Sequence, residues 1–291
     1  MSWRVVVISR RAKLELKLNY LVVRNEEIIK IHISEIAILI IENTAVSLTV
    51  CLLTELIRNK IKVVFCDEQR NPLAELAPFY GSFDATDKLR TQIAWPRCIK
   101  ELIWTEIVSE KILKQAEMLK SINHPEFEML LAYRSQIEMG DSTNREGHAA
   151  KVYFNSLFSK DFSREINCPI NAALNYGYSI ILSAINREIV ANGYLTQLGL
   201  FHDNTFNYFN FGCDLMEPFR PLVDSYVFKM RDMGEFSSIQ KLQLVRLLNE
   251  QVKIMDKNQV LLNAIKIYCK SIFNAINEGD TSEILFYSYE F

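Results

Sequence analysis

The chain has 291 residues, enough for one large domain or two ordinary ones. A hydrophobic share of 49%, a charged share of 23%, nine Gly and seven Pro exclude a collagen-like chain and argue against long disordered segments. The formal net charge of −2 excludes a strongly basic protein, so binding to nucleic acid would depend on a local basic groove.

A local surplus of basic residues lies within the first thirty positions. Such a surplus is more often a solvated face than a DNA-binding site, and both interpretations stay open. Its basic members are Arg4, Arg10, Arg11, Lys13, Lys17, Arg24 and Lys30, and its acidic members are Glu15, Glu26 and Glu27.

The cysteines and the apolar stretches bear on where the protein resides. None of the six cysteines forms a Cys-x-x-Cys pair, which argues against a zinc ribbon and favours free thiols in a reducing compartment. The first residues lack the long apolar region of a signal peptide, and the most apolar run, residues 36–41, is too short to span a bilayer. We therefore expect a cytoplasmic protein.

Short apolar runs rich in Val and Ile alternate with turns up to about residue 75, which predicts a β-rich region. Residues 13–18 alternate Leu with charged side chains, the pattern of a half-buried strand. The exception is residues 47–59, where the apolar spacing is helical and Ser47 is expected to cap the helix. The predicted strands are residues 5–8, 13–18, 20–23, 28–31, 36–41 and 62–65.

Residues 77–90 combine Pro, Gly and small polar side chains, which marks them as a linker. Residues 1–76 are then a small β-rich domain whose exposed sheet edges favour dimerisation. Residues 91–291 are a larger catalytic domain with helical spacing almost throughout. The predicted fold class is α+β, with an N-terminal β-rich domain followed by an all-α C-terminal domain. The predicted helices are residues 99–119, 126–138, 171–190, 222–231, 238–255 and 259–276.

Polar side chains that a helical core does not need gather in residues 144–154, 198–204 and 213–224. Each is weak evidence alone. Glu146 suits the first turn of a helix, and a lone His202 beside an apolar run is usually structural. Asp214 and Glu217 share a face on a helix and could bind a hard cation, although such a spacing more often belongs to an acid pair that caps a surface helix.

Prolines fix the backbone around the third segment. Pro218 and Pro221 are tolerated only in the first turn of a helix, so a helix either begins near Glu217 or is kinked there. Arg220 could contact a phosphate or pair with Asp224, one turn further on, and both interpretations stay open.

In combination the three segments resemble the CRISPR-associated integrase/endonuclease family, the first of the CRISPR-associated proteins, and most closely its type II members. The resemblance rests on the order Glu…His…Glu, on the Asn-x-Ala-Leu-Asn-Tyr-Gly-Tyr stretch between them (residues 171–178), and on three motifs. These motifs are Glu146 with Ala149, Ala150 and Tyr153; Gly199 to His202; and the run Asp-Leu-Met-Glu-Pro-Phe-Arg-Pro from Asp214 to Pro221. The third acidic position is often Asp in the family and is Glu217 here.

The resemblance implies a metal-dependent enzyme of CRISPR adaptation, part of antiviral defence. It would insert short foreign DNA fragments (spacers) into a repeat array by attack of a 3′-OH on a phosphodiester. Glu146, His202 and Glu217 would be catalytic and would bind Mg²⁺ or Mn²⁺, with Asp214 in an outer position. The alternative is a DNA-binding scaffold subunit without catalysis, and a weaker third interpretation is a general metallonuclease.

The same resemblance implies partners. These are double-stranded DNA, a second copy of the chain in a homodimer, and a dimer of the second CRISPR-associated protein. In type II systems the effector nuclease and an accessory acquisition protein take part as well.

General chemistry agrees with the metal prediction. Two carboxylates and one imidazole bind Mn²⁺ somewhat more strongly than Mg²⁺. Three tyrosines near these segments, Tyr153, Tyr176 and Tyr178, could stack on a DNA end, although their apolar surroundings favour a place in the core.

Overall fold

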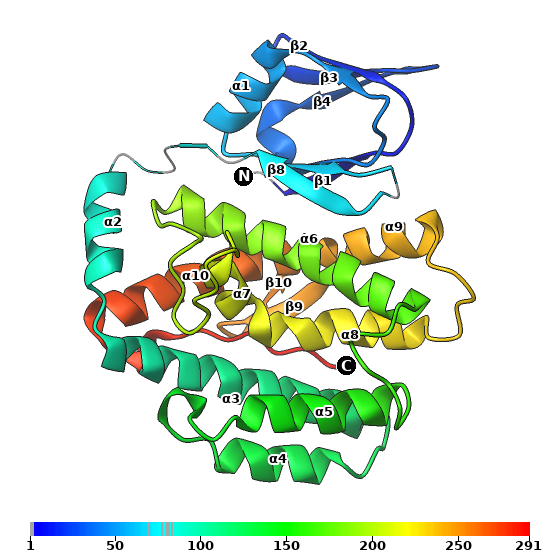
Figure 1. Ribbon diagram of the computed structural model, residues 1–291. Coiled ribbons are helices and arrows are strands. Elements are labelled where there is room, and N and C mark those ends of the chain that lie inside the picture. The colour runs from blue at the N-terminus through cyan, green and yellow to red at the C-terminus, as the bar shows by residue number, and fades with distance from the viewer. Residues whose placement is uncertain (1–2, 69, 77, 80–81, 83) are drawn as a thin grey trace.

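The computed structural model describes residues 3–68, 70–76, 78–79, 82 and 84–291. A layered β body built from the first 76 residues lies on a larger body of helices (Figure 1). The predicted order of strands followed by mostly helices is confirmed. Among the described residues, no helix combines the length and apolar character needed to cross a bilayer.

Two four-stranded sheets form the β body. The first has the order β1-β5-β7-β8 and is parallel except for β8, and the second has the order β4-β3-β2-β6 with antiparallel pairing from β2 to β4. All six predicted strands are present. The strands are β1 (Arg4–Ile8), β2 (Lys13–Lys17), β3 (Tyr20–Arg24), β4 (Ile28–His32), β5 (Ile36–Ile41), β6 (Ser47–Leu48), β7 (Lys62–Cys66) and β8 (Pro72–Leu76), with a short 3-10 turn η1 (Ile33–Glu35) before β5.

Helix α1 (Val50–Arg58) confirms the helix in the strand-rich region, but its cap differs from the prediction. The side chain of Thr49 accepts a hydrogen bond from the amide of Leu52 at 3.3 Å and closes the first turn. Ser47 instead belongs to β6, where it pairs with Lys13. The prediction of Ser47 as the cap was therefore wrong, because pairing with β2 keeps the chain extended for two further residues.

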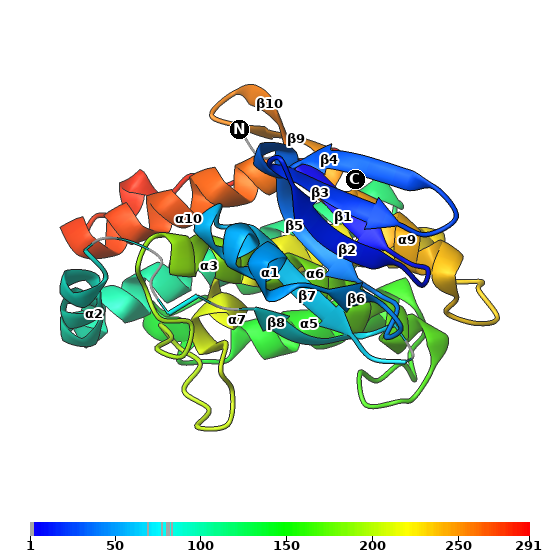
Figure 2. The same ribbon diagram turned by 90° about the horizontal axis from the view of Figure 1, so that it is seen from above.

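Strand β5 explains how the two bodies meet. All six of its residues are buried, and alternate side chains point to opposite faces of the sheet. Leu39 and Ile41 pack into the core between the two sheets, whereas Ile38 and Ile40 belong to the core of the helical body. A strand covered on both faces needs a continuous apolar run, which is what the sequence has here. Seen from above, β5 and β7 lie across α6 (Pro169–Ala191) (Figure 2).

Helix α6 runs through the centre of the helical body, as its small residues on several faces predict. At Gly177 an added Cβ would collide with a methyl group of Val223, so the glycine permits close packing of α6 against α8. The other helices are α2 (Ala85–Ala94), α3 (Arg97–Ser121), α4 (Phe127–Ser135), α5 (Arg145–Leu157), α7 (Asn210–Met216), α8 (Arg220–Lys229), α9 (Ser238–Arg246) and α10 (Leu261–Glu278). Four 3-10 turns lie between them or after them: η2 (Met139–Asp141), η3 (Glu217–Phe219), η4 (Leu247–Asn249) and η5 (Thr281–Glu283).

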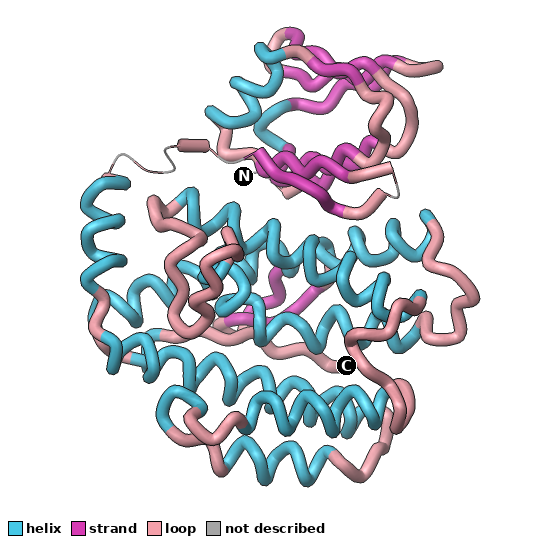
Figure 3. The backbone as a smooth tube through the Cα atoms, viewed as in Figure 1, coloured by secondary structure: helices cyan, strands magenta, loops and turns pink. Residues whose placement is uncertain are grey.

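The C-terminal part is mostly helical rather than all-α. We predicted one helix over residues 238–255, but α9 ends at Arg246 and a hairpin follows, formed by β9 (Gln251–Ile254) and β10 (Lys257–Val260). Figure 3 shows these strands behind the front helices, and the view from above shows the hairpin at the edge of the helical body (Figure 2). The two-residue turn between them has positive φ at Met255 and Asp256, the backbone form that closes a tight hairpin.

The predicted linker, residues 77–90, coincides in part with structured chain. Helix α2 begins at Ala85, inside this range. Residues 77, 80–81 and 83 of the predicted linker lie outside the described residues.

Candidate active site

Glu146 lies in the first turn of α5, and the preceding loop fixes its position. The carboxylate of Asp141 accepts hydrogen bonds from the amides of Arg145 at 2.7 Å and Glu146 at 3.0 Å. The side chain of Asn144 accepts another from Gly147 at 3.3 Å. These bonds satisfy amides that a helix start leaves without partners. The side chain of Glu146 therefore leaves the helix in a defined direction and stays partly exposed.

Glu217 stands where the chain passes from α7 to α8 through the 3-10 turn η3, as expected for a kink set by Pro218 and Pro221. Its side chain is only 4% exposed. The guanidinium of Arg220, one turn on, donates from Nε to Oε1 of Glu217 at 2.8 Å. A buried carboxylate is stable only with such partners.

His202 lies in the loop between α6 and α7, and Asp214 holds it there. The fully buried carboxylate of Asp214 accepts from the backbone amides of residues 200, 201 and 202 at 2.6, 3.1 and 3.1 Å. Its Oδ1 also lies 2.5 Å from Nδ1 of His202. Because Nδ1 is engaged, Nε2 is the nitrogen that can face a ligand. Asp214 thus stands behind the imidazole, consistent with the outer position predicted for it.

Two further contacts support this loop from outside it. The side chain of Gln92 in α2 donates to the carbonyl oxygens of Leu195 and Leu198 at 2.9 and 3.0 Å. The indole ring of Trp104 in α3 stacks on Phe201 at 4.6 Å and meets the ring of His202 edge-on at 5.7 Å.

Lys111 of α3 joins the two acids. Its ammonium contacts Oε1 of Glu146 and Oε2 of Glu217, and its side chain is 6% exposed. Lys111 follows Trp104 by seven residues, two helical turns, so both project from the same face of α3. One face of this helix therefore carries the support for His202 and the contact between the two carboxylates.

Charges in the site shift its pKa values. Burial acts to raise the pKa of Glu217, but Arg220 and Lys111 outweigh it and bring the value to about 2. The hydrogen bond with Asp214 raises the pKa of His202, and Glu217 adds to this rise. Burial acts to lower the pKa of Lys111, but Glu217 and Glu146 outweigh it and raise the value. Glu217 is thus ionised at neutral pH beside two cations.

The structure brings Glu146 and Glu217 together and places His202 close enough to feel the charge of Glu217. Within the part of the chain that the structure describes, no three His, Cys, Asp or Glu side chains are arranged to hold a metal ion. The donor set nevertheless suits Mg²⁺ or Mn²⁺, since two carboxylates already converge on one positive charge. The three-ligand site therefore stays a prediction.

Neither role predicted for Arg220 appears among its contacts. It pairs with Glu217 rather than Asp224, and its guanidinium lies 4.6 Å from the centre of the Tyr178 ring. Asp224 instead accepts from the hydroxyl of Tyr178 in the buried interior. A phosphate contact by Arg220 stays a prediction.

The three tyrosines proposed for DNA stacking are core residues. Tyr153, Tyr176 and Tyr178 are 0%, 2% and 7% exposed. The alternative of a place in the core is the one that the structure supports.

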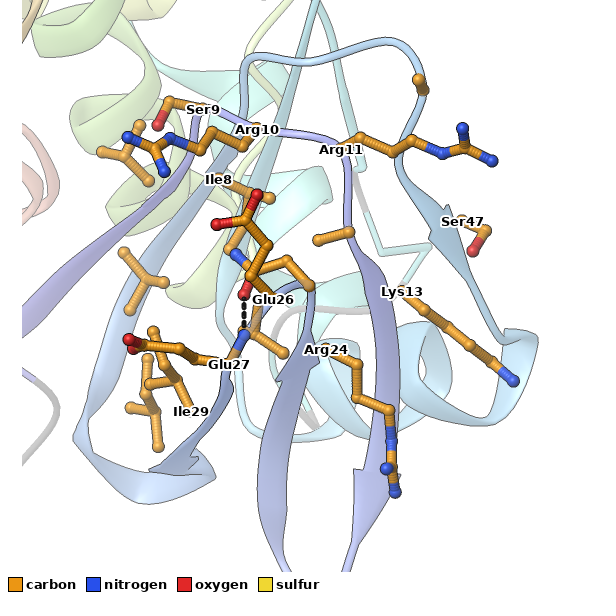
Figure 4. A pocket seen from close by; sticks show the side chains of 17 residues that line it. Ile8, Ser9, Arg10, Arg11, Lys13, Arg24, Glu26, Glu27, Ile29 and Ser47 are labelled. Atoms are coloured by element: carbon orange, nitrogen blue, oxygen red, sulfur yellow. Dashed lines mark hydrogen bonds between the residues drawn. The ribbon is translucent and has the colours of Figure 1, made fainter.

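Two separate hollows lie near charged residues of interest. One, of about 630 Å³, borders the site and is lined by His202 and its loop together with Arg97 and Lys100 of the start of α3. The other, of about 950 Å³, lies in the β body, away from the acids. Figure 4 shows Arg10, Arg11 and Lys13 around this second hollow, with two glutamates on the adjacent β3–β4 turn. Of the seven basic residues in the N-terminal surplus, Arg10, Arg11, Lys13 and Arg24 line this hollow.

Sequence reasoning missed Lys111 and Asp141. Lys111 occurs in an amphipathic helix rich in Lys and Glu, where a lysine normally faces solvent. Asp141 ends the 3-10 turn η2, four residues before α5 begins, and its left-handed backbone at φ 52° leaves no sequence signal beyond the neighbouring Gly140. The polar run from Asp141 to Asn144 could have suggested a helix start, but not the two hydrogen bonds that Asp141 accepts.

Comparisons with known proteins identify the family. Residues 5–255 match the family model described as CRISPR associated protein Cas1. The CRISPR-associated endonuclease Cas1 of Neisseria meningitidis serogroup C (strain 8013) is 32% identical over 290 residues, covering 98% of this chain and 95% of the relative.

Solved structures show the same fold. A casposase bound to integration product superimposes with a TM-score of 0.78 at 20% identity, covering 97% of this chain and 92% of the casposase. A CAS1 protein from Thermotoga maritima gives 0.77 at 18% identity, covering 96% and 98%. A Cas6-RT-Cas1–Cas2 complex gives 0.75 at 18% identity, covering 97% of this chain and 36% of that one. With the family match and the Neisseria relative, these findings establish that the chain belongs to the Cas1 family of CRISPR-associated proteins.

Proposed function

We propose that this protein is a metal-dependent DNA integrase that joins short DNA fragments to a CRISPR repeat array. The reaction is attack of a DNA 3′-OH on a phosphodiester of the array. The observation that carries the proposal is the meeting of Glu146 and Glu217, from α5 and η3, beside a positioned His202 in a member of the Cas1 family. The printed names of relatives and neighbours, an endonuclease and a casposase bound to integration product, support the same chemistry.

Glu146, Glu217 and His202 would hold Mg²⁺ or Mn²⁺ in this proposal. A divalent cation there supplies polarisation of the scissile phosphate and stabilisation of the leaving oxygen. The chain itself sets the charge and the orientation of these ligands. Glu217 is ionised because Arg220 and Lys111 lower its pKa, and His202 is oriented because Asp214 engages its Nδ1.

Arg220 would bind a DNA phosphate as well as Glu217. Only its Nε donates to Glu217 among the bonds described, and its side chain is 27% exposed. Its remaining N–H groups can therefore reach a phosphate oxygen, which the fork of a guanidinium suits. Arg97 and Lys100 in the hollow next to His202 would attract the flanking DNA backbone.

The proposed partners follow the family. They are double-stranded DNA, a second copy of the chain, and a dimer of the second CRISPR-associated protein. The fold shared with a Cas6-RT-Cas1–Cas2 complex supports the last of these. A type II effector nuclease and an accessory acquisition protein belong to the same proposal.

A scaffold role is the second candidate, and one observation favours it. Lys111 stands in contact with both acids, and the described residues hold no assembled three-ligand group. On this view the acids and Lys111 are a structural ion cluster, and the protein binds DNA for another subunit.

A strand-transfer assay separates the two candidates. The purified chain is mixed with a labelled DNA fragment and a repeat-containing plasmid, with and without the second CRISPR-associated protein. Each mixture is run with Mn²⁺ and with EDTA. The integrase proposal expects joined product only with Mn²⁺. DNA binding without joined product in any mixture would favour the scaffold.

A further inference from the structure

Lys111 has an unusual place for a lysine. It belongs to α3, yet its ammonium contacts one carboxylate from α5 and another from η3, and the residue is only 5% exposed. Burial removes the ammonium from water, so only close ionic partners make this position tolerable.

The charges around Lys111 are balanced. Glu146 and Glu217 contribute two negative charges, and Lys111 and Arg220 contribute two positive charges. A divalent cation entering this cluster would leave it with an excess of two positive charges in a buried setting. Such an excess is unfavourable unless one of the resident cations moves away.

Among the ion pairs described, Arg220 contacts one of the two acids. It binds Oε1 of Glu217 and also lies over the ring of Tyr178. Lys111 binds Oε2 of Glu217 and Oε1 of Glu146, so it alone contacts both acids. A cation shared by the two acids would compete with Lys111 for these oxygens. The Lys111 ammonium sits on a flexible four-carbon stem and can withdraw when an ion takes its place.

We propose that Lys111 is a tethered substitute for the divalent cation: it holds Glu146 and Glu217 together until the metal ion enters and displaces its ammonium from both. The proposal rests on the proposed function, because it assumes that these two acids are metal ligands. Lys111 is then a positioning residue that sets the affinity for the metal ion. It keeps the two acids close and charged, and it makes the ion compete for them.

The same helix offers a matched control. Lys114 is also buried, and its ammonium lies between Glu110 at 3.1 Å and Glu117 at 3.0 Å. Both partners of Lys114 belong to α3 itself and neither is a predicted ligand. Lys111→Met and Lys114→Met therefore remove the same charge from the same kind of pair on the same helix. Only the first touches the predicted ligands.

The test is calorimetric titration of MnCl₂ into the full-length wild type and both variants, with folding checked by circular dichroism. Lys111→Met should bind Mn²⁺ at least about tenfold more tightly than the wild type, since the ion no longer competes with an ion pair. Without Mn²⁺ it should also melt at a lower temperature than the wild type, and added Mn²⁺ should raise its melting temperature by more than that of the wild type. Lys114→Met should melt lower as well but bind Mn²⁺ as the wild type does.

Equal or weaker Mn²⁺ binding by Lys111→Met would overturn the inference while leaving the metal site of the proposed function intact. Absence of Mn²⁺ binding in the wild type and both variants would overturn the metal site itself, and the inference with it. A crystal structure of the wild type grown with MnCl₂ tests the displacement without any variant. The Lys111 ammonium should lie out of hydrogen-bonding range of both acids, and an ammonium still in contact with both would refute the displacement.

Discussion

Asp214→Asn is the change that best measures how the site is held. The Asp214 carboxylate accepts four hydrogen bonds, three from backbone amides of residues 200–202 and one shared with Nδ1 of His202. An asparagine of the same shape has one acceptor oxygen, and its NH₂ group would face two of the four donors. Hydrogen bonds to a charged group contribute about 1.5–3 kcal/mol each, so two lost bonds should destabilise the protein by roughly 3–6 kcal/mol.

Urea unfolding followed by circular dichroism measures this loss, with Asp203→Asn as the control. Asp203 follows His202 in the same loop but is exposed, so its variant should stay within about 0.5 kcal/mol of the wild type. A second readout is the pKa of His202, which Asp214 raises and which should fall in the variant. The reasoning would be refuted if Asp214→Asn unfolded within about 1 kcal/mol of the wild type and left the pKa of His202 unchanged.

The pH dependence of this loss has a defined sign. A histidine whose pKa is raised on folding contributes stability that is fully present below its unfolded pKa and is lost as pH rises through its folded pKa. The pKa of His202 is raised mainly by the hydrogen bond with Asp214. The difference between wild type and Asp214→Asn should therefore be larger at pH 5.5 than at pH 9, as the same urea titrations will show.

Three further predictions concern other parts of the molecule. Burial raises the pKa of Asp224 to about 7, so the free energy of unfolding of the wild type should fall as pH rises from about 4 to 7. Asp224→Asn should remove up to roughly 4 kcal/mol of that fall, as measured by urea titrations at each pH. Ile28 and Ile29 are 60% and 47% exposed on the edge strand β4, so replacing both with Lys should shift the full-length chain from dimer to monomer in light scattering. DNA affinity should fall with added salt, and replacing Arg10 and Arg11 with Ala should flatten the slope of log affinity against log salt by up to about 2 in fluorescence anisotropy.

Each of these has an outcome that would contradict it. For Asp224, the result would be a wild type and variant with parallel stability curves from pH 4 to 8. For β4, it would be an unchanged dimer, with Val50→Lys on the exposed face of α1 serving as the control for added charge. For Arg10 and Arg11, the contradicting result would be a slope of log affinity against log salt that the double replacement leaves unaltered. DNA would then bind elsewhere on the protein.

The sequence predicts the elements whose pattern depends on burial alone. The run from Ile36 to Ile41 indicates a strand covered on both faces, and β5 is one because α6 and the second sheet enclose it. The hairpin after α9 escapes prediction because residues 247–257 have no Gly or Pro. Its turn places Met255 and Asp256 in a left-handed backbone, which suits Asp but is uncommon for Met.

In the candidate site, too, local features could be predicted from the sequence and contacts between distant residues could not. Local backbone rules account for a helix start before Glu146 and a kink beside Glu217, but the resemblance to a family, not these rules, singles the two acids out as a site. The partners that lie far away in the chain are not visible in the sequence. Lys111 meets Glu217 across 106 residues, and no local pattern distinguishes it from a solvated lysine of the same helix.

The central claim is that Glu146, His202 and Glu217 act as one metal-dependent unit, and strand transfer by their single Ala variants at saturating Mn²⁺ tests it most directly. Residues that act as a unit fail together, so each variant should lose at least roughly 100-fold in rate while keeping its helical circular dichroism and its DNA binding. Glu217→Asp, which keeps the charge and shortens the reach, should lose less than Glu217→Ala. Robust joining by folded Glu146→Ala or His202→Ala would contradict the claim and leave the scaffold role in its place.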